Sequence, residues 1–426
     1  MLIIRGARVI DPAQNIDEIK DIYIKDNVFS AEAPEDARVI DATGLVAAPG
    51  LVDMHVHFRE PGFTHKEDLL TGAAAAAAGG VTTAVCMPNT KPVIDSAETV
   101  RLIAERAENA DIRVLTYAAV TTGQAGNELT DFTSLKNAGA IALSDDGNPI
   151  MNADIMRKAL RCANKLGFVI SCHSEDADMV QNYAVNEGAV SQKLGIPGRP
   201  AIAEELMITR DVMLAMETGA KVHIAHISTA KSVEIVRQAK IIGVKITAET
   251  CPQYFTLTEN EVLTRGAMAR MNPPLRTQAD VEGIIVGLID GTIDAIATDH
   301  APHSDAEKAL PLTEAPSGII GLETSLALAI TKLYHTNKLS LAEIIGKMST
   351  SPSKILGLDA GIHTVGSLDT GKSADIVLFN PEEVWTVDPT KFKSKARNTP
   401  FSGMELQGRV KYTISRGKVV YKDEDQ

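Results

Sequence analysis

The sequence is poor in the residues that build disulfide frameworks and basic binding surfaces. Its four cysteines (Cys86, Cys162, Cys172 and Cys251) are scattered and form no C-x-x-C pair, which argues against a disulfide scaffold or a thiolate metal site. Lysine and arginine form no cluster, and the formal net charge is −13. This charge argues against nucleic acid or an anionic membrane surface as a partner.

Long apolar segments are also missing. No uninterrupted apolar run approaches the roughly 18 residues of a transmembrane helix. The N-terminal stretch "MLIIRGARVIDPAQN" lacks the apolar region and small-residue cleavage site of a signal peptide. We therefore expect a cytoplasmic protein, whose 426 residues suit one large domain with an accessory unit.

What the sequence does contain is an alternation of short apolar runs and helix-like segments. The runs are residues 51–58, 81–89, 112–120, 140–147, 167–175, 221–228, 244–251 and 293–303. Helical patterns lie between them at 66–78, 97–109, 153–165, 202–218 and 279–290. Eight near-continuous apolar strands alternating with helices predict an α/β fold, a (β/α)8 TIM-like barrel.

The two ends of the chain have a different pattern. Residues 1–50 and 365–426 indicate short strands joined by turns. We expect them to meet in a small β-sandwich domain, with the barrel spanning residues 51–364. The last residues, "KDEDQ", are expected to form a solvated tail.

Polar residues gather at the carboxyl end of several predicted strands, the rim where such barrels carry their active sites. His55 and His57 in "LVDMHVHF" are two residues apart, so strand alternation places them on one face. The same alternation extends that face to Arg59. The candidate ligands are His55, His57, one of Asp145 and Asp146, His173, His226 and Asp299.

Four imidazoles and two carboxylates exceed the needs of one tetrahedral ion but suit two divalent ions with a bridging carboxylate. Imidazole-rich sites favour zinc over magnesium or calcium. Two such ions would lower the pKa of a shared water and supply hydroxide, and a carboxylate could carry its proton to a leaving nitrogen. The residues thus predict metal-assisted hydrolysis.

The motifs resemble those of the cyclic amidohydrolases in the amidohydrolase superfamily, most specifically the dihydroorotase family of the long, free-standing bacterial type. The resemblance rests on "PGLVDMHVHFREPG", "MPNTKPV", "SDDG", "HSED", "AHIST", "MNPPLR", "ATDHAPH", "GLET" and "NTPFSGMELQGRV". These motifs span nearly the whole chain, in the expected order. The family reaction is the reversible closure of N-carbamoyl-L-aspartate to (S)-dihydroorotate in de novo pyrimidine synthesis.

The resemblance implies roles for individual residues. His55, His57 and Asp299 would hold one zinc ion, His173 and His226 the other, and Asp146 would bridge them. Asp299 would also carry the proton. The implied substrate contacts are His57, Arg59, Asn89, Asn272, His303, Ser317 and Gly318; Arg59, Asn89 and His303 among them would grip the substrate carboxylate. The family also implies a possible homodimer and an association with aspartate transcarbamoylase.

Other readings stay open on the sequence alone. "ETCPQYF" is close to hydantoinases and dihydropyrimidinases, but those enzymes bridge their metals with a carbamylated lysine, where this chain has Asp146. Allantoinases share the late "NTPF" pattern, but allantoin has no carboxylate for Arg59 to bind. A non-catalytic scaffolding homologue is the third alternative. The polar segment that begins at Ser304 and leads to Gly318 is expected to be a loop that closes over substrate.

Overall fold

The computed structural model describes residues 1–423, and its centre is a ring of parallel strands. Eight strands pair in chain order: β6 (Leu51–Val56), β7 (Val81–Cys86), β8 (Arg113–Ala118), β9 (Ala142–Ser144), β10 (Ile170–Cys172), β13 (Val222–Ile224), β14 (Ile246–Thr250) and β15 (Ala295–Ile296). A parallel bridge between Val56 and His300 joins the last strand to the first. This ring confirms the predicted barrel.

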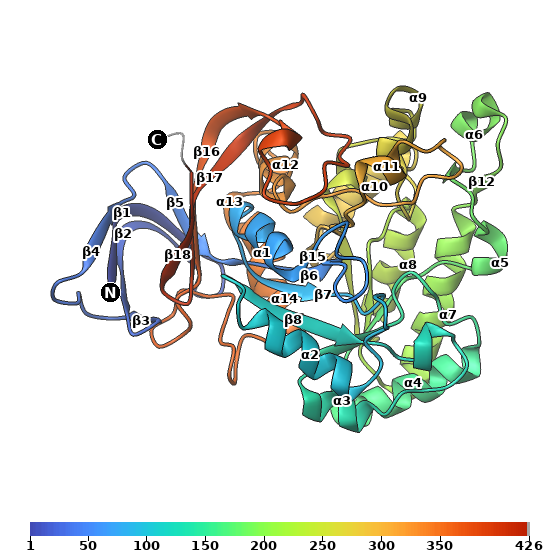
Figure 1. Ribbon diagram of the computed structural model, residues 1–426, viewed down its shortest axis with the longest axis horizontal. Coiled ribbons are helices and arrows are strands. Elements are labelled where there is room, and N and C mark those ends of the chain that lie inside the picture. Colours follow the sequence, from blue (N-terminus) through green and yellow to red (C-terminus); the bar gives the residue numbers. More distant parts are fainter. Residues whose placement is uncertain (424–426) are drawn as a thin grey trace.

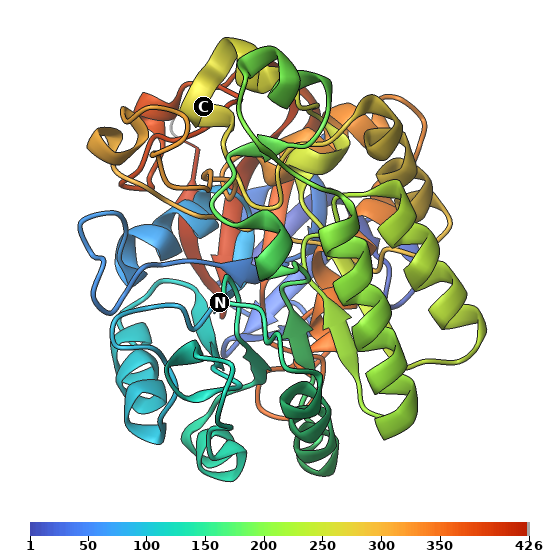
Figure 2. The same ribbon diagram turned by 90° about the vertical axis from the view of Figure 1, so that its right-hand side faces the viewer.

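Helices lie outside the ring of strands (Figure 1, Figure 2). The main ones are α1 (Leu69–Ala78), α2 (Ala97–Ala107), α3 (Phe132–Ala138), α4 (Ala153–Leu166), α7 (Ile202–Thr218), α8 (Ala230–Ile241) and α10 (Gln278–Ile289). The shorter ones are α5 (Ala177–Val180), α6 (Ala189–Leu194), α9 (Glu261–Arg265), α11 (Asp305–Lys308), α12 (Ser325–Ala329), α13 (Leu341–Ile345) and α14 (Ser351–Ile355). Strands β11 (Val185–Asn186) and β12 (Gly198–Arg199) form a separate small sheet.

Helix α1 shows how local sequence sets these boundaries. It begins after Asp68, whose carboxylate accepts hydrogen bonds from the backbone N–H groups of Leu70 and Thr71. It ends at Gly79, where an added Cβ would lie 2.1 Å from the carbonyl oxygen of Leu322. The absence of a side chain at Gly79 therefore allows the close approach to Leu322. The alanines between these caps are strong helix formers.

Strands from both ends of the chain form a second eight-stranded sheet beside the barrel, coloured blue and red in Figure 1. Its order is β18–β17–β16–β5–β1–β2–β3, with β4 also paired to β1. These strands are β1 (Leu2–Asp11), β2 (Ile16–Lys25), β3 (Val28–Ser30), β4 (Arg38–Asp41), β5 (Val46–Pro49), β16 (Ile376–Thr386), β17 (Glu405–Ser415) and β18 (Lys418–Lys422). The division into domains at residues 50 and 365 stays a prediction.

Polar contacts fasten this end sheet to the barrel. Arg113 of β8 donates from Nη1 to Asp375 Oδ2 at 3.0 Å and to Thr83 Oγ1 at 3.1 Å. Asp375 is buried, and its second oxygen accepts the backbone N–H of Arg416 at 2.8 Å. A guanidinium and a carboxylate taken out of water together depend on each other for compensation.

The chain terminus corrects one expectation. Asp423 is buried, and its carboxylate pairs with Arg409 and with Lys411 at 2.8 Å, so the prediction of a solvated tail is wrong at this residue. The rest of the predicted tail, residues 424–426, lies outside the described residues. Within residues 1–423 no helix has both the length and the apolar character needed to cross a membrane.

Removing the charge of Asp375 should loosen the end sheet. We expect Asp375→Asn to lower the free energy of unfolding by about 2 kcal/mol, because it leaves the Arg113 guanidinium, whose side chain is 12% exposed, without its counter-ion. Asp17→Asn is the matched control, since Asp17 pairs with Arg8 in an exposed position and should contribute less than about 1 kcal/mol. Denaturant unfolding of both variants measures the difference, and equal losses would contradict a role for the junction.

Candidate active site

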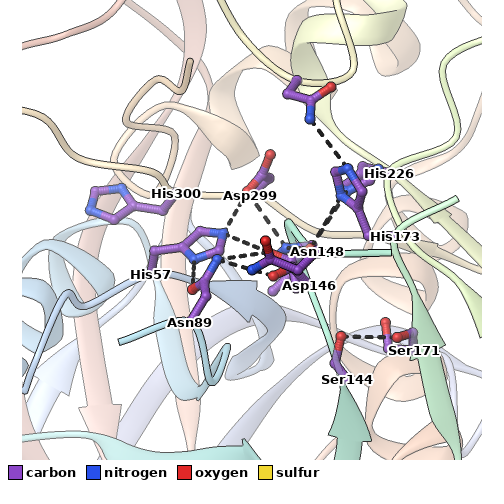
Figure 3. A network of polar contacts seen from close by, with 12 residues as sticks. His57, Asn89, Ser144, Asp146, Asn148, Ser171, His173, His226, Asp299 and His300 are labelled. Carbon is purple, nitrogen blue, oxygen red and sulfur yellow. Dashed lines mark hydrogen bonds and ion pairs between the residues drawn. The ribbon is translucent and has the colours of Figure 1, made fainter. Parts of the chain in front are cut away.

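The six predicted metal ligands converge at one end of the barrel. His55 lies in β6, and His57, Asp146, His173, His226 and Asp299 each follow within three residues of the end of a barrel strand. All six are buried. Figure 3 shows His57, Asp146, His173, His226 and Asp299 turned toward one another. Parallel strands end at the same edge of the barrel, so short strands were sufficient to bring these distant residues together.

The first group consists of His55, His57 and Asp299. Oδ1 of Asp299 lies 3.0 Å from His57 Nε2 and 3.5 Å from His55 Nε2. Ligand atoms of these three residues all lie within 4.8 Å of one another, close enough to hold one metal ion.

A second group shares His55 with the first and adds Asp146 and His226, again within 4.8 Å of one another. Oδ1 of Asp146 lies 3.5 Å from His55 Nε2, 3.4 Å from His173 Nδ1 and 3.7 Å from His226 Nε2. Oδ2 of Asp146 lies 3.5 Å from His57 Nε2. Asp146 therefore belongs to the second group and also lies close to His57 of the first.

The unsatisfied atoms of this cluster fit a cation. Within residues 1–423, His55 Nε2 and Asp146 Oδ1 are buried and make no hydrogen bond. Burial alone would raise the pKa of Asp146, but the neighbouring His55, His173 and His226 hold it well below its usual range. Burial alone would lower the pKa of His55, whereas Asp146 and Asp299 raise it well above its usual range. Such a set of imidazoles and carboxylates is what a divalent transition metal binds.

Backbone geometry at the rim is unusual. His226, Asp299 and Arg59 have φ values of +34°, +49° and +61°, a region that residues other than glycine rarely adopt. Each such residue costs on the order of 1 kcal/mol or more and persists only where its surroundings enforce it. The strain falls on three residues that the sequence assigned to the site.

Arg59 reaches the site by a different route from the predicted one. Strand β6 ends at Val56, so the expectation that alternation carries Arg59 onto the face of His57 is wrong. The positive φ of Arg59 instead turns its side chain beside His303, with Nη2 3.4 Å from His303 Nε2 and Nε donating to the carbonyl of Pro302. Burial lowers the pKa of Arg59 to about 10, which leaves it charged near neutral pH.

A cavity of about 160 Å³ opens onto this cluster. Among the predicted substrate contacts, His57, Arg59, Asn89, Asn272, Ser317 and Gly318 line it. His303 lies behind this wall, buried, with Nε2 2.9 Å from the carbonyl oxygen of Ser317. Burial together with Arg59 and Lys66 lowers the pKa of His303 to about 2, so its imidazole is neutral.

The segment between Ser304 and Gly318 contains a feature that the sequence analysis missed. Lys308 is buried, and its Nζ donates to the carbonyl oxygens of Arg270, Pro316 and Gly318 at 3.0 to 3.2 Å. Burial lowers the pKa of Lys308 to about 7. These bonds fix the backbone of Gly318 at the cavity wall, and closure of this segment over a substrate stays a prediction.

Carboxylates and amides behind the histidines were also missed. His55 Nδ1 donates to Glu249 at 2.7 Å, His57 Nδ1 donates to Asn89 Oδ1 at 2.9 Å, and His173 Nε2 lies 3.4 Å from Glu175. Glu249 belongs to "ETCPQYF" and Glu175 to "HSED", so both stood in motifs whose acids had no assigned partner.

Two neighbours of predicted ligands have separate structural roles. Asp145 accepts hydrogen bonds from the backbone N–H groups of Val120 at 2.8 Å and Thr121 at 3.1 Å. Its contacts are therefore with the backbone after β8 and not with the histidines that surround Asp146. His300 points away from the cluster in Figure 3, and its Nε2 lies 3.5 Å from Glu67 Oε2.

Curated relatives match the chain over its full length. A dihydroorotase from Clostridioides difficile (strain 630) is 50% identical over 426 residues, covering 99% of this chain and 100% of the relative. A dihydroorotase from Lactococcus lactis subsp. lactis (strain IL1403) is 47% identical and covers 99% of both chains.

Solved structures give the same architecture at lower identity. The L-hydantoinase (dihydropyrimidinase) from Arthrobacter aurescens has a TM-score of 0.87 and 25% identity, covering 99% of this chain and 96% of its own. The D-hydantoinase from a Bacillus sp. AR9 also has a TM-score of 0.87, with 26% identity and coverage of 100% and 96%.

Family profiles agree with these relatives. Residues 44–232 match a profile described as dihydro-orotase-like, and residues 288–421 match one described as the amidohydrolase family. The two matches include both halves of the ligand cluster. Together with 50% identity across the whole length of a curated relative, they show that the chain belongs to the dihydroorotase family of amidohydrolases.

Proposed function

We propose that the protein is a dihydroorotase that interconverts N-carbamoyl-L-aspartate and (S)-dihydroorotate in pyrimidine synthesis. Its curated full-length relatives carry that name, and the amidohydrolase profile supports a cyclic amide hydrolase. The observation that carries the proposal is the position of Arg59, a half-buried guanidinium that lines the same cavity as His57 and Asp299. A planar cation beside the reacting groups suits a substrate that carries a carboxylate.

The proposed cofactor is a pair of zinc ions. His55, His57 and Asp299 would hold one ion, His173 and His226 the other, with Asp146 between them. When bound, the ions supply Lewis acidity that activates water and polarises the carbonyl under attack. The excess of imidazole over oxygen donors supports zinc rather than magnesium.

Asp299 is the proposed proton carrier. It lines the cavity, and its Oδ1 is 3.0 Å from His57 Nε2. During hydrolysis its carboxylate takes a proton from the attacking water and passes it to the ring nitrogen as the amide bond breaks. Ring closure runs the same transfer in reverse.

The remaining cavity residues orient the substrate. Arg59 and Asn89 are proposed to grip its carboxylate, with His303 acting from behind the wall through its contact with Arg59, and Asn272 with Ser317 and Gly318 to contact the ring. Asn89 also binds both sides of the metal cluster, because its Oδ1 accepts from His57 and its Nδ2 donates to Asp146 Oδ2 at 3.2 Å. It can therefore couple the position of the substrate to that of the ligands.

Hydantoinase and allantoinase activities are the competing enzymatic functions. The solved hydantoinase structures share the fold, but neither hydantoin nor allantoin carries a carboxylate for Arg59. A non-catalytic scaffold would not need six buried ligand groups. We further propose a cytoplasmic location, a homodimer and an association with aspartate transcarbamoylase.

A substrate panel tests the proposed activity. The zinc-loaded protein should turn over dihydroorotate at least 100-fold faster, by kcat/KM, than dihydrouracil, hydantoin or allantoin. Arg59→Met should raise KM for dihydroorotate about 10- to 100-fold, as expected for the roughly 1.5–3 kcal/mol of a hydrogen bond to a charged group. Its zinc content should not change. A preference for an uncharged ring would refute the proposed substrate.

Metal content tests the bridging position. Asp146→Ala should lower bound zinc from two ions to one, measured by atomic emission on the desalted protein, because it removes the carboxylate between the groups. Asp145→Ala is the neighbouring control and should keep both ions while losing stability, since Asp145 bonds only to the backbone and hydroxyl of its surroundings. The opposite pattern would move the bridge by one residue.

Turnover of an Asp299 variant tests the proton carrier. Asp299→Ala should lower kcat by a factor on the order of 10³ or more, because it removes a ligand and the group that moves the proton. Asp290→Ala, at a surface ion pair with Arg237, should leave kcat within about twofold of the parent. Near-normal turnover by Asp299→Ala, in an assay of dihydroorotate hydrolysis, would exclude that role.

A further inference from the structure

A line of buried polar side chains runs from the candidate metal cluster into the wall of the barrel. His55 Nδ1 lies 2.7 Å from Glu249 Oε1, and Glu249 Oε2 lies 3.3 Å from His223 Nε2. His223 Nδ1 in turn lies 2.8 Å from Thr247 Oγ1. The three charged or imidazole side chains come from β6, β14 and β13, and none is more than 1% exposed.

These contacts determine where the protons lie. An ionised carboxylate only accepts hydrogen bonds, so His55 must carry a proton on Nδ1. In the neutral form of the ring, which is the form that binds a metal, Nε2 is then left with a free lone pair. That atom is the one 3.5 Å from both Asp146 Oδ1 and Asp299 Oδ1, so the lone pair is directed between the two predicted metal positions. Any other tautomer of His55 would present a proton there instead.

His223 completes the environment of the carboxylate. Its Nε2 lies 3.3 Å from the second oxygen of Glu249, an ion-pair contact in which neither atom makes a hydrogen bond, while the Thr247 hydroxyl can donate to Nδ1. His223 lies three residues before His226, and strand alternation gives it no place in the metal cluster. Its position behind Glu249 accounts for a buried histidine that otherwise has no role.

Glu249 is not paired with a lysine or an arginine among the described residues. Among residues 1–423, no lysine or arginine forms an ion pair with Glu249, whereas Glu175 behind His173 is paired with Arg199 at 2.7 Å. Glu249 is 1% exposed, and its two oxygens face imidazoles, His55 at 2.7 Å and His223 at 3.3 Å. A carboxylate kept ionised in the protein interior costs several kcal/mol in desolvation, so an apolar residue would serve mere packing better.

His55 is also the one residue common to both groups of potential ligands among the described residues. Fixing its ring therefore affects both proposed ions at once. Carboxylates that accept the second N–H of a metal-bound histidine set its tautomer and raise its basicity, and their removal weakens metal binding about 10- to 100-fold.

We propose that Glu249 and His223 are positioning residues that hold His55 in its metal-binding tautomer and orientation. Glu249 acts on His55 directly, and His223 acts through Glu249. The inference rests on the proposed zinc site, and it adds two residues behind that site whose effect is on zinc affinity.

Zinc affinity, measured by competition with a chromophoric chelator, tests this without any substrate. Glu249→Gln should raise the Kd of the more weakly held zinc ion about 10- to 100-fold. His223→Ala should raise it by a smaller factor, and His223→Gln should recover most of the loss, because its amide can still donate to Glu249. The matched control is Asp375→Asn, which removes a buried charge at the distant junction and should lower stability with zinc affinity unchanged.

Thermal unfolding of the metal-free proteins shows which variants fold, and the zinc affinities of those that do fold decide the outcome. If Glu249→Gln binds zinc as tightly as the parent, or loses no more affinity than Asp375→Asn, the inference is overturned. If Glu249→Gln does not fold, the His223 pair decides, and unchanged affinity in His223→Ala overturns it equally. A parent protein that binds no zinc would refute the proposed metal site itself, a result distinct from parent-like binding in the variants.

Discussion

The contact between the first and last strands of the barrel is the constraint on which the site depends. His57 N donates to His300 O at 2.9 Å, next to the bridge between Val56 and His300. The buried carboxylate of Asp53 adds a second tie, because its Oδ1 accepts from the backbone N–H groups of His55 at 3.1 Å and Thr298 at 3.2 Å. These few bonds set the separation of His55 and His57 from Asp299.

Local electrostatics, rather than overall charge, decide what this site can attract. The protein has a net charge of −13, and several of its carboxylates are buried in the cluster itself. Against this background the cavity wall presents the guanidinium of Arg59, with Lys66 in the layer behind it. A small anion is therefore drawn by a few fixed cations at short range, where screening by salt is weakest.

Sequence patterns predicted the barrel, the sheet of both chain ends and the convergence of the six candidate ligands, because these follow from local periodicity and from where strands end. They failed where a residue depends on a distant partner. Arg59 could not be placed by alternation, since a positive φ turns the chain after β6. Glu249 and Lys308 could not be assigned, because their partners lie on other strands and loops far along the chain.

The end sheet has a consequence for how the chain is made. Strand β5, at residues 46–49, pairs with β16, which begins at Ile376, so more than three hundred residues separate the two partners. During synthesis the first five strands must wait, with an unpaired edge, until nearly all of the polypeptide has left the ribosome. Pairings of such long range are slow to form and expose nascent chains to aggregation. This topology therefore leaves the edge of β5 without its partner until the last strands emerge.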